Sequence, residues 1–203
     1  MKRIIAVTIA LFVICTSALG AAEGISFIDT INSREILYSV QSIDKVALYN
    51  YDRELAQSLV NEIRQEYCSL TFDLYKLKIT DTDEITYGIV LSYNDWKNID
   101  EKVNIGKYID YKEIQTLINA FKGMKEEYDK DQKTNKLTEQ YIFTSIRYNS
   151  KSGLIFWGGT GGTFSSIIGI QFDEENYMEI KTEDEYNILL NYFESIETII
   201  NLL

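Results

Sequence analysis

The chain has 203 residues, 45% of them hydrophobic, which suits a globular protein with a sizeable core and is too apolar for disorder. Its formal charge is −11, so we expect no nucleic-acid partner, because such binding relies on a basic surface. The chain contains no histidine and only two cysteines, which excludes Ser-His-Asp and Cys-His catalysis, histidine zinc sites and a disulfide framework.

Residues 1–22 have the pattern of a secretory signal peptide. Lys2 and Arg3 precede an apolar run over residues 4–14, and small residues follow as far as Ala22. The apolar run is too short to remain in a bilayer as a spanning helix. We therefore expect export to the periplasm or the extracellular space, with no integral membrane segment after cleavage.

Cys15 leaves a second interpretation open. A lipoprotein signal places its cysteine after a small residue, whereas Ile14 precedes this one, so lipid anchoring at Cys15 is the alternative prediction. Cleavage after Gly20 or Ala22 would leave Cys68 as the lone cysteine of the mature chain. We expect Cys68 to be a partly buried apolar side chain, since no histidine is present to activate it.

The first elements after the signal are predicted from weak patterns. Short strands are expected at residues 26–28, 36–40 and 46–50. A helix capped by Asp52 is expected to carry an apolar face that extends to Ile63.

An antiparallel hairpin follows. The apolar positions alternate through residues 70–74 and then switch parity through residues 75–79, which predicts a bulge near Leu74. Residues 81–84 form the turn, and residues 85–93 alternate without a break as the second strand. Residues 94–106 are predicted to be a polar connection, with Trp96 and Val103 as its apolar contacts.

Two helices have strong local signals. Asp110 and Glu113 form a capping box, followed by a buried stripe, and the charged run 125–136 is expected to end that helix. Thr182 and Glu185 form a second capping box before the C-terminal helix. The two predicted stripes are Ile114, Leu117, Ile118, Phe121 and Met124, and Tyr186, Leu189, Leu190, Phe193 and Ile196.

Between these helices the pattern predicts strands at residues 141–148, 153–157, 165–172 and 177–180. The predicted fold is α+β: a largely antiparallel sheet with amphipathic helices packed on one face, with residues 23–203 as a single domain. The helices share their cap-to-stripe spacing, which indicates either two strand–strand–helix halves meeting near residues 129–137 or the ordinary geometry of capped helices.

The glycine-rich stretch after Trp157 is the main candidate binding site. It fails as a phosphate loop, because no Gly-Lys-Ser/Thr ending follows and Phe164 stands where a dinucleotide motif requires glycine. We expect two central strands joined by a glycine turn, with a partner site at the tip. The candidate binding residues are Trp157, Gly158, Gly159, Thr160, Gly161 and Gly162, together with Trp96.

Other chemistries are weakly supported. An EF-hand match over residues 129–140 fails at Thr134 and Gln140, and we predict no metal, cofactor or catalytic residue. The favoured function is an exported, non-catalytic binding or interaction module with a protein or glycan partner. The alternatives are a carbohydrate-binding module that uses exposed tryptophan and tyrosine, and a small hydrolase with a carboxylate pair.

Overall fold

The computed structural model describes residues 26–33, 38–43, 61–97, 102–134, 144–160 and 166–203. The predicted signal peptide, Cys15, the strand at residues 46–50, the helix start at Asp52 and the glycines at 161 and 162 lie outside these residues. Within the described residues, no helix is both long and apolar enough to cross a membrane.

The described strands form two antiparallel sheets. The five-stranded sheet has the order β1 (Tyr38–Ile43), β3 (Cys68–Ile79), β4 (Ile85–Asp95) and β5 (Val103–Asp110), and β2 (Glu62–Arg64) also pairs with β3. The four-stranded sheet has the order β6 (Thr144–Asn149), β7 (Ile155–Thr160), β8 (Ile168–Gln171) and β9 (Tyr177–Ile180). The expected hairpins and the two central strands are thereby confirmed.

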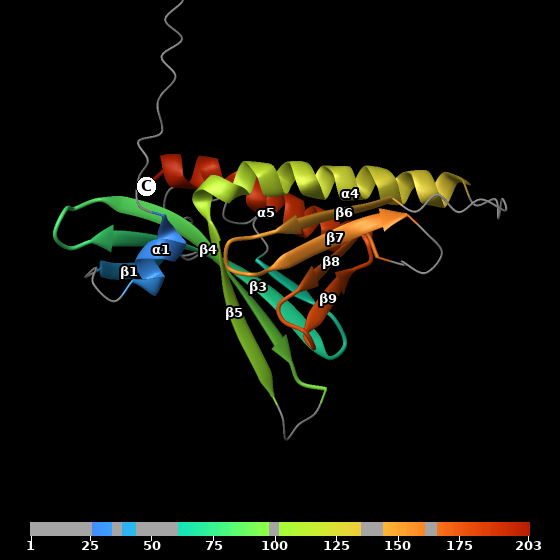
Figure 1. Ribbon diagram of the computed structural model, residues 1–203, viewed down its shortest axis with the longest axis horizontal. Helices are drawn as coiled ribbons and strands as arrows, with labels where there is room; N and C mark the ends of the chain where they lie inside the picture. Colours follow the sequence, from blue (N-terminus) through green and yellow to red (C-terminus); the bar gives the residue numbers. More distant parts are fainter. Residues whose placement is uncertain (1–25, 34–37, 44–60, 98–101, 135–143, 161–165) are drawn as a thin grey trace, which may run out of the picture.

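Helices pack against both sheets. Besides α1 (Phe27–Asn32), the chain forms α4 (Ile114–Thr134), entered through the 3-10 turn η1 (Tyr111–Glu113), and α5 (Glu183–Asn201). The two long helices lie together along one side of the molecule, with the sheets beneath them (Figure 1). Both capping boxes are formed and their stripes are buried or partly buried, which confirms the α+β class and the start and buried face of each helix. The charged run does not end the first of them as early as expected, because α4 continues through it to Thr134.

One hydrophobic core joins the two sheets and the two long helices. The Phe121 ring of α4 lies 5.3 Å from that of Phe156 in β7 and 5.5 Å from that of Phe193 in α5. In α5, the Tyr192 ring lies 4.6 Å from Phe72 of β3. The C-terminal helix therefore packs on the five-stranded sheet and on α4, and α4 packs on the four-stranded sheet.

The parity switch in β3 has a different cause from the predicted bulge. The register with β4 is continuous from Cys68 to Lys78, so the bulge prediction is wrong. Instead, Leu74 and the apolar residues before it face the main core, whereas Leu77 and Ile79 face Phe27 of α1 on the opposite side of the sheet. A regular strand that is buried on different faces at its two ends gives the same pattern.

Three further predictions are corrected. Residues 26–28 form no strand: Ser26 is the N-cap of α1, which begins at Phe27, and the Phe27 ring packs over the backbone of Gly88. Ile63 lies in strand β2 and not on a helix. Residues 103–106, predicted to belong to the connection 94–106, begin strand β5. Lys107 interrupts the apolar alternation of this edge strand, so the pattern did not indicate a strand.

Candidate binding site

The outer face of the four-stranded sheet carries the strongest candidate site. Phe156, Ile170 and Met178 point into the core beneath the helices, so the alternate residues of these strands face outward. Neighbours across the strands follow from the register, as Arg147 pairs with Trp157, Trp157 with Gly169 and Gly169 with Glu179. We call this surface the Trp157 face; its members are Arg147, Asn149, Ile155, Trp157, Gly169, Gln171, Tyr177 and Glu179.

The Trp157 indole lies flat on the sheet. A Cβ atom built at Gly169 would lie 2.1 Å from Trp157 Cε2, 2.2 Å from Cζ2 and 2.7 Å from Cδ2. These three distances put the Cβ position under the face of the ring and not beside its edge. Gly169 is therefore the residue that lets the indole rest on the backbone, and any larger side chain there would lift it.

A second aromatic residue extends this surface. Tyr177 of β9 is 55% exposed, and its ring centroid lies 6.3 Å from that of Trp157, with the planes inclined at 55°. Trp157 itself is half-buried, because one face of its ring covers the sheet. The two rings thus form a small aromatic surface.

Polar side chains surround the rings. Arg147 Nε donates to Asn149 Oδ1 at 3.1 Å along one edge of the Trp157 face. At the other edge Glu179 forms an ion pair with Lys181, whose Nζ lies 2.9 Å from Glu179 Oε2. Hydrogen-bonding groups therefore border the aromatic surface on both sides.

The candidate glycines have different surroundings. At Gly158, an added Cβ would lie 2.7 Å from Cβ of Met124 and 2.8 Å from the Ile167 carbonyl oxygen, so this glycine admits α4 against the sheet. Gly159 and Thr160 continue β7 and pair with β6. Close packing of α4 thus explains why a glycine stands at position 158. The backbone there is an ordinary extended strand and does not require the conformational freedom of glycine.

Trp96 belongs to the other sheet. It follows β4, and its backbone N–H donates to the carbonyl of Tyr67 in the turn between β2 and β3, at 2.9 Å. Trp96 is therefore not a member of the Trp157 face, which is formed by the four-stranded sheet. Of the candidate residues from the sequence, Trp157 lies at the centre of this face, and the structure places Gly169 and Tyr177 beside it.

Two signals could have identified the added residues. Gly169 interrupts an apolar strand between Ile168 and Ile170, and a glycine inside a strand often marks the close approach of another group. Tyr177 alternates with the buried Met178, which assigns it to the outer face.

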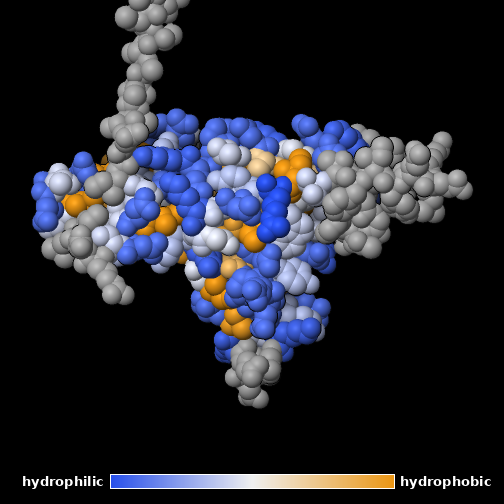
Figure 2. All heavy atoms as spheres, viewed as in Figure 1, coloured by the Kyte–Doolittle hydropathy of each residue, from blue (hydrophilic) through white to orange (hydrophobic). Residues whose placement is uncertain are grey.

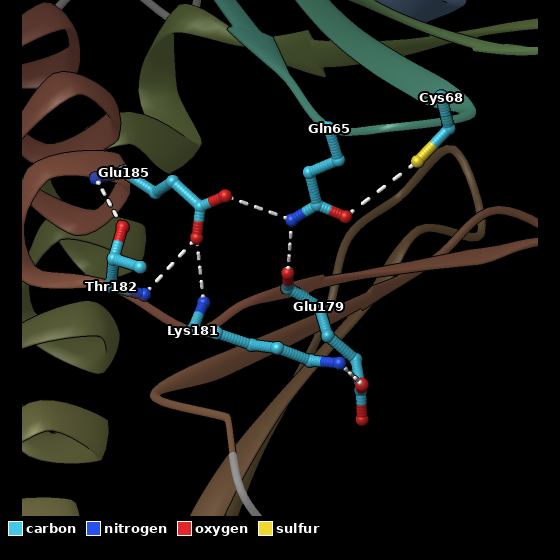
Figure 3. A network of polar contacts seen from close by, with 6 residues as sticks. All are labelled: Gln65, Cys68, Glu179, Lys181, Thr182 and Glu185. Carbon is cyan, nitrogen blue, oxygen red and sulfur yellow. Dashed lines mark hydrogen bonds and ion pairs between the residues drawn. The ribbon is translucent and has the colours of Figure 1, made fainter.

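A polar network fastens the two sheets to each other near Cys68 (Figure 3). Gln65 donates through Nε2 to the Glu179 carbonyl at 2.7 Å and to Glu185 Oε1 at 3.0 Å, and its Oε1 accepts from the Cys68 thiol at 3.6 Å. Glu185 Oε2 accepts from the backbone N–H groups of Lys181 and Thr182. These bonds make the network a structural joint.

The Cys68 thiol is unsuited to nucleophilic chemistry. Burial, followed by the charges of Asp95 and Glu185, raises its pKa, so the reactive thiolate is disfavoured. Cys68 is half-buried and packs against the core, as predicted from the sequence.

Asp110 and Glu113 are the buried acids of the first capping box. The carboxylate oxygens of both accept hydrogen bonds from groups that hold the fold together. Asp110 Oδ2 accepts from Ser26 Oγ at 2.5 Å and from the Phe27 N–H at 3.1 Å. Glu113 Oε1 accepts from Tyr148 Oη at 3.0 Å and from the Lys151 N–H at 3.1 Å. Since their oxygens hold the fold together, these acids give no support to a hydrolytic carboxylate pair.

In the part of the chain that the structure describes, no group of three acidic or cysteine side chains lies close enough to hold a metal ion. No family model matches this chain, and neither curated proteins nor solved structures gave a match.

Proposed function

We propose that this chain is an exported, non-catalytic binding module, and that it binds its partner through the Trp157 face. The observation that carries the proposal is the indole of Trp157, which rests on Gly169 and lies beside the exposed ring of Tyr177. An aromatic ring left at the surface provides contact area at a small cost in side-chain entropy. Such residues are favoured at binding surfaces.

A binding role agrees with the chemistry of the remaining groups. The two buried acids of the first capping box are engaged by structural donors, and the pKa of the Cys68 thiol is raised. The chain has no histidine to act as a general base. These features favour recognition over catalysis.

The test compares binding to fractionated envelope material by the purified full chain and by two variants. Trp157→Ala should lose retention of the bound component, whereas Trp96→Ala, which removes the tryptophan of the other sheet, should keep it. Circular dichroism would verify that both variants are folded. Equal retention by Trp157→Ala and the unchanged chain would refute the proposal.

Export is part of this proposal and has its own measurement. The intact mass of the protein recovered outside the cytoplasm should correspond to cleavage after Gly20 or Ala22. A mass that includes a lipid on Cys15 would replace soluble export with membrane anchoring.

A further inference from the structure

We propose that the ligand of the Trp157 face is a neutral polysaccharide, whose sugar rings stack on Trp157 and Tyr177. This inference rests on the proposed function, because it names the ligand of the same face. A pyranose ring has a flat face of C–H groups and an edge of hydroxyls. It therefore needs a flat apolar surface with hydrogen-bonding groups beside it.

The flatness of the indole is the first argument. Because Gly169 supports one face of the Trp157 ring, the other face is the one directed away from the sheet. A ring held in this way is preorganised, and little rotamer entropy remains to be lost when a ligand stacks on it. A sugar ring matches such a surface, since one face of its chair presents C–H groups over an area similar to that of the indole.

The second argument is the neighbouring Tyr177. Its ring centroid lies 6.3 Å from that of Trp157, and the side chain is 55% exposed. The two residues lie on β7 and β9, and the indole reaches across Gly169 of β8 between them. Two aromatic rings at this separation can contact successive sugar units of one chain. The inclination of 55° suits a polysaccharide that twists along its length.

The third argument is the polar border. Gln171, Arg147 and Glu179 lie on the same face as the indole, at positions given by the strand register. Planar amide, guanidinium and carboxylate groups accept from and donate to pairs of hydroxyls. They would fix the orientation of a sugar whose apolar face covers Trp157.

The charges on the Trp157 face and on the whole chain favour a neutral ligand. The face carries Arg147 and Glu179, which are of opposite sign, and Glu179 is paired with Lys181. The whole chain has a formal charge of −11. A polyanion such as nucleic acid, whose bases also stack on aromatic rings, would be repelled.

The apolar area is too small for a typical protein interface. Stable interfaces bury about 800 Å² on each partner and have an apolar centre. In the described part of the chain the exposed large apolar side chains are scattered, and Tyr177 is the one on this face; the others are Val40, Tyr67, Ile85, Tyr111 and Leu203. The view in Figure 2 likewise shows a largely hydrophilic surface with small, separate hydrophobic patches.

Affinity electrophoresis of the full chain in gels containing a neutral polysaccharide provides the test. A β-glucan, a xylan and a mannan serve as neutral probes, and polygalacturonate serves as the anionic comparison. We expect at least one neutral probe to retard the chain and polygalacturonate to leave it unaffected. Trp157→Ala should weaken the affinity at least tenfold, as is typical of a central aromatic contact.

Two glycine variants separate stacking from folding. Gly169→Ala keeps the indole but lifts it from the sheet, so the affinity should fall several-fold. Gly106→Ala is the matched control, because its Cβ would lie 4.0 Å from the nearest atom, in ordinary contact with Val90 Cγ1. It should bind like the unchanged chain. If Gly169→Ala unfolds, Tyr177→Phe and Tyr177→Ala test the same surface at an exposed side chain, with loss expected for Ala only.

The outcomes distinguish this inference from the proposed function. No retardation by any neutral polysaccharide, together with Trp157-dependent retention of an envelope protein, overturns the glycan and keeps the binding module. Retardation that Trp157→Ala leaves unchanged overturns both. Retardation that is strongest with polygalacturonate overturns the neutral ligand.

Discussion

At the scale of single residues, a few glycines leave room for large side chains from distant parts of the chain to pack directly on the backbone. Phe27 fills the position of a Cβ at Gly88, and Trp157 fills that of Gly169. Both glycines lie in extended strands, so they are needed because they lack a side chain and not because of their backbone conformation. The first contact closes a small core, and the second supports the candidate site.

Gly88→Ala should destabilise the protein strongly. Its new Cβ would lie 2.3 Å from Phe27 Cδ1 and 2.4 Å from Cγ, and Phe27 is fully buried. We expect a loss of about 1–3 kcal/mol in the free energy of unfolding, measured by urea denaturation. Gly106→Ala is the control with little expected change; an equal loss in both variants would contradict this account.

Glu185 should make stability depend on pH. Burial raises the pKa of its carboxyl group, but hydrogen bonds from Lys181, Gln65 and Thr182 outweigh burial and lower the pKa below its usual value of 4.5. The unfolded state then binds more protons as the pH falls below about 4.5, so the contribution is complete above that pH and is lost below it.

Glu185→Gln tests this dependence. The variant should be about 1 kcal/mol less stable at pH 7, because it weakens the cap of α5, and the difference from the unchanged chain should shrink below pH 4.5. Asp184→Asn, at an exposed acid of the same turn, is the control. A difference that stays constant from pH 7 to pH 3 would show that Glu185 is not the group responsible.

At the scale of elements, each capping box also binds the other half of the chain. Glu113, at the start of α4, accepts from Tyr148 and Lys151 of the β6–β7 hairpin. Glu185, at the start of α5, accepts from Gln65 of the β2–β3 hairpin. The order of elements is also shared, since β2 to β5 precede α4 and β6 to β9 precede α5. An origin by duplication stays a prediction.

Asp110 should matter more than Thr182, although both are N-caps. Asp110 bonds Lys112 of its own turn and also Ser26 and Phe27 at the start of α1, whereas Thr182 caps α5 alone. We expect Asp110→Ala to cost about 3 kcal/mol, since it leaves buried donors unsatisfied, and Thr182→Ala about 1 kcal/mol. Urea denaturation measures both, and equal losses would mean that the contact with α1 contributes nothing.

At the scale of the whole molecule, the shared core predicts one cooperative unit. Trp96 directly follows β4 of the five-stranded sheet, Trp157 lies in β7 of the four-stranded sheet, and the chain has no other tryptophan. Trp96→Phe and Trp157→Phe therefore each leave a fluorescent probe in one half. Tyr192 of α5 contacts the five-stranded sheet, and Phe193 contacts Phe121 of α4, which also packs on the four-stranded sheet. The two probes should therefore report the same unfolding midpoint, and circular dichroism of each variant should give that midpoint as well. Separate midpoints would divide the chain into two domains.

Features that depend on neighbours along the chain could be predicted from the amino-acid sequence alone. The capping boxes at Asp110 and Thr182, the stripes that follow them and the strands of both hairpins rest on local hydrogen bonds and on the helix and strand periods. It also identified Trp157 as a candidate binding residue.

Features that depend on contacts between residues distant in the chain could not be predicted in this way. Residues 27–32 form a helix whose Phe27 packs over Gly88, and α1 covers the far side of β3. This burial, and not a bulge, accounts for the parity switch in β3. Trp157 lies flat because the register brings Gly169 beside it. Periodicity reports which side of an element is apolar, but the partner that covers that side is set by packing across the fold.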